Sequence, residues 1–113
     1  MSVRDLINQR QVECRSGDLM PTRAGEVMVE LSSLLGNINN EILEREIAYN
    51  KKLLECLDTE KTANRAKIVA ETSEEYKFMR EAKNAEKVAL EIIRSLKYYL
   101  RAKDDEMRQA GNM

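Results

Sequence analysis

Apolar side chains recur every three to four residues along two long segments of this chain, the spacing that gathers them on one face of an α-helix. In residues 22–58 the apolar face keeps one phase for about nine helical turns, and its members are Ala24, Val27, Met28, Leu31, Leu34, Leu35, Ile38, Ile42, Tyr49, Leu53, Cys56 and Leu57. In residues 72–108 a second face contains Tyr76, Met79, Ala82, Ala89, Ile93, Leu96, Leu100 and Met107. The first face has the same phase on both sides of Gly36, which indicates a continuous or slightly bent helix. The pattern predicts an elongated antiparallel helical hairpin that packs like a coiled coil.

The start of the chain carries signals for a shorter helix. Ser2 stands three residues before Asp5, a spacing at which the hydroxyl accepts a hydrogen bond from a first-turn amide, so we expect a short helix over residues 2–14. A serine, a glycine and an aspartate then follow, and residues 15–21 are expected to form a loop. The single proline at the end of this loop suits the first turn of the next helix, which Thr22 is expected to cap.

The segment between the two long helices is mostly polar. Residues 59–75 are therefore expected to form a projecting polar tip or turn region. Within it, Thr72 and Glu75 match the capping box, in which a hydroxyl and a carboxylate each accept a hydrogen bond from a free first-turn amide. This pattern places the start of the last helix near residue 72, and Asp58 with Thr59 offers a second candidate start. Residues 109–113 are expected to form a tail, and residues 1–113 a single helical domain.

The composition agrees with an all-α fold. Charged residues make up 35% of the chain and aromatic residues 4%, with four glycines and one proline. Because few side chains are bulky enough to fill a thick globular core, a thin helical seam suits this chain better. No apolar run approaches the ~20 residues of a transmembrane helix, and residues 1–12 lack the apolar segment of a signal peptide. We therefore expect a cytoplasmic protein without a membrane partner.

Side chains that would indicate an enzyme or a metal site are scarce. The chain has no histidine, and Cys14 and Cys56 are far apart, each without a second cysteine at a zinc-binding spacing. Cys56 falls in phase with the first apolar face, which indicates a small core residue. Neither a glycine-rich phosphate loop nor a calcium-binding loop occurs. We expect no catalytic residues, no metal, no cofactor and no small-molecule substrate.

The net charge of −1 hides two segments of opposite charge. Residues 24–60 carry eight acidic and three basic residues, a net charge of −5, whereas residues 61–103 carry eleven basic and six acidic residues, a net charge of +5. Six cations follow one edge of the second apolar face: Arg80, Lys83, Lys87, Arg94, Lys97 and Arg101. One interpretation is that the opposite charges only orient the two helices as they pair. The alternative is that the bases around the tip bind nucleic-acid phosphates; these are Lys61, Arg65, Lys67, Lys77, Arg80, Lys83 and Lys87.

A second and smaller apolar line lies away from the main face of the first long helix, and one hairpin cannot cover both. Its members are Val29, Leu43, Ile47 and Leu54. An isolated hairpin buries too little apolar surface to offset comfortably the conformational entropy that its chain loses on folding. We therefore expect these residues to join the subunits of a homo-oligomer. A dimer that forms a four-helix bundle is the simplest version. Adjacent Tyr98 and Tyr99 point about 100° apart on a helix, so one should enter the seam while the other stays more exposed.

Three segments carry a resemblance to known proteins: Ala63 to Ile68, Glu71 to Tyr76, and Ile93 to Arg101. Over residues 22–108 the chain resembles small helical proteins of phage and prophage genomes, which are often encoded beside recombination genes. Its layout is also similar to that of phage recombination mediators, oligomeric helical proteins that load a recombinase onto single-stranded DNA. The resemblance implies a non-enzymatic oligomeric accessory factor in DNA recombination or replication in the host cytoplasm, with single-stranded DNA or a recombination protein as partner. The alternative is a structural or adaptor coiled-coil protein that binds a protein partner and no nucleic acid.

Overall fold

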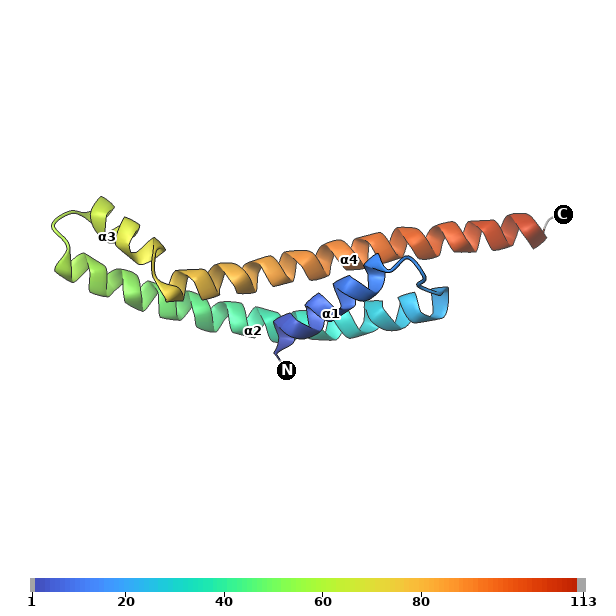
Figure 1. Cartoon of the computed structure of the whole chain (residues 1–113), viewed down its shortest axis with the longest axis horizontal. Helices are drawn as coiled ribbons and strands as arrows, with labels where there is room; N and C mark the ends of the chain where they lie inside the picture. The colour runs from blue at the N-terminus through green and yellow to red at the C-terminus, as the bar shows by residue number, and fades with distance from the viewer. Residues whose placement is uncertain (1, 112–113) are drawn as a thin grey trace.

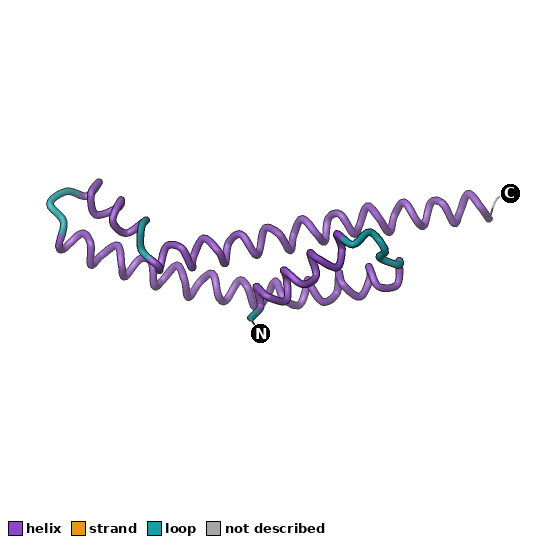
Figure 2. The backbone as a smooth tube through the Cα atoms, viewed as in Figure 1, coloured by secondary structure: helices purple, strands orange, loops and turns teal. Residues whose placement is uncertain are grey.

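The computed structural model describes residues 2–111, which form four α-helices and no strand (Figure 1). Helix α1 spans Val3–Arg15, α2 spans Pro21–Thr59, α3 spans Ala63–Glu71 and α4 spans Glu74–Gly111. The molecule is a rod of 74 × 26 × 21 Å in which α2 and α4 run antiparallel, and Figure 2 shows the short loops that join the helices. The predicted all-α, elongated helical hairpin with a short N-terminal helix is confirmed.

The core is a narrow seam between α2 and α4. Its buried members on α2 are Ala24, Val27, Leu31, Leu34 and Ile38, and those on α4 are Ala82, Ala85, Ala89, Ile92 and Leu96. Most of them belong to the two predicted apolar faces. Three alanines occupy the middle of the α4 side, and such short side chains let neighbouring helix backbones pack closely. Helix α2 continues through Gly36 without a break, as its unchanged apolar phase predicted.

Helix α1 packs against both long helices and turns part of the hairpin into a three-helix bundle (Figure 1). The predicted cap is present, because the Ser2 hydroxyl accepts a hydrogen bond of 3.1 Å from the amide three residues further on. Ile7 has no exposed surface and belongs to the main core cluster. The Arg4 guanidinium forms ion pairs with Glu41 of α2, at 3.5 Å, and with Glu81 of α4. Arg4 therefore links all three helices, a role that the local pattern of the sequence did not indicate.

The loop between α1 and α2 contains Gly17, whose φ of +84° is a left-handed conformation that glycine adopts at low cost. Helix α2 then begins at Pro21, where the missing amide hydrogen is not needed. Met20 occupies the N-cap position and makes no side-chain hydrogen bond to the helix. The predicted capping of α2 by Thr22 is therefore wrong, because that residue already lies inside the first turn.

The predicted polar tip, residues 59–75, is more ordered than expected, since it contains α3 folded back against α2 (Figure 1). Thr62 caps this helix, and its hydroxyl accepts a hydrogen bond of 3.1 Å from the amide three residues further on. Ala66 and Ala70 are one helical turn apart and form a second, small apolar cluster with Cys56. A helix of this length has only two buried positions, which is too short a pattern to stand out in the sequence.

The start of α4 also differs from the prediction in detail. The Ser73 hydroxyl accepts a hydrogen bond of 3.3 Å from the amide of Tyr76, whereas the Thr72 hydroxyl donates to the carbonyl of Val69 at 2.7 Å. The predicted capping of this helix by Thr72 is wrong, because Thr72 satisfies a carbonyl at the end of α3 instead.

At its other end α4 extends beyond α2 and continues as a single helix (Figure 1). Residues 104–111 are exposed throughout, and the side chain of Met107 is 74% exposed. The expected place of Met107 in the seam is therefore wrong, since no α2 surface reaches it. The predicted tail is helical as far as Gly111, and residues 112–113 lie outside the described part of the chain.

Candidate functional site

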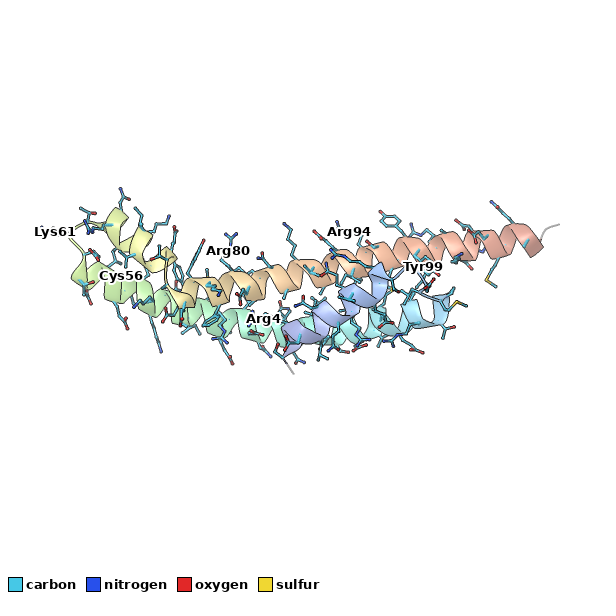
Figure 3. All side chains as sticks on the ribbon, in the orientation of Figure 1. Arg4, Cys56, Lys61, Arg80, Arg94 and Tyr99 are labelled. Carbon is cyan, nitrogen blue, oxygen red and sulfur yellow. The ribbon has the colours of Figure 1, made fainter. Side chains whose placement is uncertain are left out.

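The seven cations predicted around the tip do not form one compact site. Lys61 lies in the loop at the far end of the rod, whereas Arg80 lies on the body of α4 (Figure 3). Arg65 and Lys67 belong to the short helix α3. The remaining three also lie on α4, and they are Lys77, Lys83 and Lys87.

Among residues 2–111, three of these seven cations have an acidic partner. Arg65 and Lys77 pair with glutamates nearby in sequence, at nitrogen–oxygen distances of 3.2 and 4.0 Å. The ammonium of Lys83 lies 3.1 Å from the carboxylate of Glu46 and joins α4 to α2. That pair is the arrangement expected if opposite charges orient the two helices. Pairing between the two long helices therefore explains the position of Lys83, but not the positions of the other cations along the edge of the second apolar face.

Six cations follow one edge of the apolar face of α4, and five of them form what we call the basic face: Arg80, Lys87, Arg94, Lys97 and Arg101. All five are exposed, and none forms an ion pair with any residue that the structure describes. At about 100° per residue they fall within roughly 100° of the helix circumference. Figure 3 shows Arg80 and Arg94 on the same side of α4, away from α2. Helix α1 packs on a different flank of α4, beside Glu81 and Val88, and leaves the basic face uncovered.

The basic face is straight as well as open. Four of its members stand seven residues apart, and they are Arg80, Lys87, Arg94 and Arg101. Seven residues make nearly two helical turns, so these charges follow one row with a spacing of about 10 Å and a length of about 32 Å. A small anion reaches only one or two such charges, whereas an extended polyanion can contact the whole row.

An exposed tyrosine stands within this row. The ring of Tyr98 is 64% exposed and lines a surface groove of about 170 Å³ together with Arg94, Lys97 and Arg101. Its neighbour Tyr99 is half-buried, and its hydroxyl donates a hydrogen bond of 2.5 Å to a carbonyl in the loop between α1 and α2. The prediction that one tyrosine enters the seam while the other stays exposed is confirmed.

The predicted nucleic-acid site is centred on the tip and does not include this groove. The signal that would have found it is an exposed aromatic residue with cations four residues before, one before and three after, a spacing that puts the two outer cations beside the ring on a helix. By contrast, the ring of Tyr76 near the tip already contacts neighbouring side chains. Its ring centroid lies 5.3 Å from that of Tyr49, and the Arg80 guanidinium lies 6.0 Å from the Tyr76 ring. Burial also raises the pKa of the Tyr49 hydroxyl.

The second apolar line lies on the outer face of α2, away from α4. The side chains of Val29, Leu43, Ile47 and Leu54 are 69, 57, 48 and 63% exposed. Their exposure agrees with the argument that one hairpin cannot cover both apolar lines of α2. The homo-oligomer inferred from that argument stays a prediction.

Potential metal ligands are not gathered in the described part of the molecule. Within residues 2–111, no three His, Cys, Asp or Glu side chains come together in a way that could hold a metal ion. Burial raises the pKa of the Cys14 thiol, which disfavours the reactive thiolate, and Cys56 is buried in the tip cluster. None of the helices in this range contains an apolar stretch long enough to cross a bilayer. Comparison of the chain with protein-family models, with curated proteins and with solved structures found no match.

Proposed function

We propose that this protein is a non-enzymatic binding factor that holds single-stranded DNA along the basic face of α4. The observation that carries the proposal is the row of five exposed cations without an acidic partner in the described chain, interrupted by one exposed tyrosine. A phosphate backbone that lies along this row of about 32 Å releases its condensed counterions as the exposed cations replace them. The net charge of −1 gives no global attraction for nucleic acid, so binding depends on this local face.

The exposed ring of Tyr98 favours a single strand over a duplex. Proteins that bind single strands combine a basic track with aromatic side chains on which unpaired bases stack. In a duplex the bases are already stacked and paired, and a tyrosine on a straight helix has no unpaired base to contact. Tyr98 has cations on both sides along the helix, so a base on its ring keeps the flanking phosphates near Arg94 and Arg101.

In this proposal the protein acts in the host cytoplasm as an accessory factor in DNA recombination or replication of the phage type. Its resemblance to phage recombination mediators supports that role, since those proteins also work by binding and not by catalysis. The competing function is that of a structural or adaptor coiled-coil protein. The interhelical Lys83–Glu46 pair favours it, because an acidic helix of another protein would meet the basic face in the same way.

The test is a fluorescence-anisotropy titration with a labelled single-stranded oligonucleotide at two salt concentrations. Five phosphate contacts give a slope of about −3.5 in a plot of log affinity against log salt, so affinity should fall roughly 100-fold between about 50 and about 200 mM salt. A duplex of the same sequence should bind more weakly than the single strand. No binding of the single strand at the lower salt would refute the DNA proposal and favour the adaptor.

Two matched triple variants locate the site. The first changes Arg94, Lys97 and Arg101 to glutamate, and the second changes Lys61, Arg65 and Lys67 to glutamate, with the same change in net charge. All six side chains are exposed, so both variants should fold, as circular dichroism will show. We expect the first to abolish binding at the higher salt and the second to weaken it only slightly. Equal losses would refute the assignment to the α4 face.

The stacking role of Tyr98 is tested separately. Tyr98→Ala should weaken binding of the single strand by about 1–3 kcal/mol, whereas Tyr98→Phe should keep most of the affinity because its ring still stacks. An equal loss in both variants would show that the hydroxyl, and not the ring, makes the contact.

A further inference from the structure

The outer face of α2 carries a complete heptad row in addition to the seam with α4. Starting at Val29, the positions that face outward alternate in steps of four and three residues, and they are Val29, Ser33, Gly36, Asn40, Leu43, Ile47, Asn50 and Leu54. All eight are exposed. This is the spacing at which one helix meets another in a coiled coil. The four apolar members alone would be a broken line, but with the small and polar residues between them the row is continuous over about 38 Å.

We propose that this outer row is the interface of a homodimer in which the α2 helices of two copies pack antiparallel. The partner is a second copy because antiparallel packing of the row against itself places large side chains opposite small ones. When Asn40 of one copy lies opposite Leu43 of the other, Ile47 faces Gly36 and Leu54 faces Val29. A Cβ atom built on Gly36 has no atom within 4 Å, so that position offers open space to the side chain opposite. By two-fold symmetry each of these contacts occurs twice.

The charges beside the row agree with the same register. Glu30 and Lys51 occupy equivalent positions on one flank, and antiparallel packing brings Glu30 of one copy close to Lys51 of the other. Lys51 is exposed and has no ion-pair partner within the described chain. Glu30 lies 3.6 Å from the Arg10 guanidinium and keeps 36% of its side chain exposed, so it is able to take a second cation. The same register pairs Glu44 with an uncharged asparagine, which avoids repulsion.

Parallel packing would use the same row less well. It would place Gly36 opposite Gly36, Asn40 opposite Asn40 and Asn50 opposite Asn50. The first of these contacts leaves a gap, because neither copy has a side chain there. The antiparallel arrangement instead places Ile47 opposite Gly36, which fills that gap, and it therefore fits the sizes of the side chains in the row better.

The first experiment measures molecular mass by sedimentation equilibrium at about 10 and about 300 µM protein, a range that brackets a weak dimer. We expect the mass to rise from near that of the 13.0 kDa chain toward twice that value. The variant with Leu43→Glu and Ile47→Glu should stay monomeric over the whole range. Val12→Glu is the control, because Val12 is 68% exposed on α1 and lies outside the row, and it should dimerise like the wild type. A wild-type monomer at the higher concentration would overturn the proposal, as would a dimer of the double variant.

The second experiment tests the register with spin labels in a variant in which both native cysteines are replaced. In the antiparallel register a label at position 55 lies about 40 Å along the axis from the same label in the other copy, whereas labels at position 39 lie within about 10 Å along it. In a parallel dimer both distances would be short. A short distance at position 55 would therefore overturn the proposed arrangement. Mass and label distances do not depend on DNA, so failure of this proposal and failure of the proposed function are distinguishable.

Discussion

Replacing Ile7 with alanine tests whether α1 is an integral part of the bundle. Of the residues described in α1, Ile7 is the one that is fully buried, and its side chain packs into the cluster formed by α2 and α4. The substitution removes three carbon atoms from this core. Buried isoleucine-to-alanine changes cost about 2–5 kcal/mol, and the better helix propensity of alanine returns a few tenths, so we expect a loss of about 3 kcal/mol.

The assay is thermal and urea unfolding followed by circular dichroism at one fixed protein concentration. For a domain of this size, a loss of 3 kcal/mol lowers the Tm by roughly 12 °C. The control is Val12→Ala on the exposed side of the same helix, which should change stability by no more than about 0.5 kcal/mol. An effect of Ile7→Ala below about 1 kcal/mol, or equal to that of the control, would refute the three-helix arrangement.

Three further predictions concern separate contacts. The hydrogen bond from Arg23 lowers the pKa of the Glu13 carboxylate, so its stabilisation is present above the unfolded-state pKa and is lost as the pH falls through the folded-state pKa. Glu13→Gln should therefore be less stable than the wild type near neutral pH, and the difference should shrink in acid; a constant difference in a pH series of urea titrations would contradict this. Tyr99→Phe removes the hydrogen bond to the Leu19 carbonyl and should cost about 1 kcal/mol in thermal unfolding, and no change would show that the bond contributes nothing. Amides of α3, which has only Ala66 and Ala70 buried, should exchange with deuterium faster than those in the middle of α4, and equal protection would refute a weakly held tip.

Most of the fold was predictable because its main feature is periodic. The two apolar faces repeat over many turns, so a few exceptions did not obscure the hairpin, and the unchanged phase around Gly36 correctly indicated one long α2. The Ser2 cap was equally clear, since capping depends on residues three positions apart. A structural feature whose sequence signal is local or repeated many times can therefore be predicted from a single sequence.

The parts that were not predicted depend on contacts between distant residues. Arg4 meets Glu81 only because α1 folds back along the bundle, and Met107 is exposed because α2 begins too late to cover it. For the candidate site, the basic stripe itself was visible in the sequence. Only the structure shows that Lys83 pairs with α2 whereas the cations of the basic face have no acidic partner among the described residues.

The three buried alanines in the middle of α4 have a mechanical consequence. Alanine has no side-chain torsion angle to adjust, so at Ala82, Ala85 and Ala89 the α4 side of the seam has a fixed shape, against which the larger side chains of α2 pack. A change in the spacing of the two long helices at this point would therefore have to come from new rotamers of the larger α2 side chains, such as Leu34 and Ile38, while the α4 surface keeps its shape.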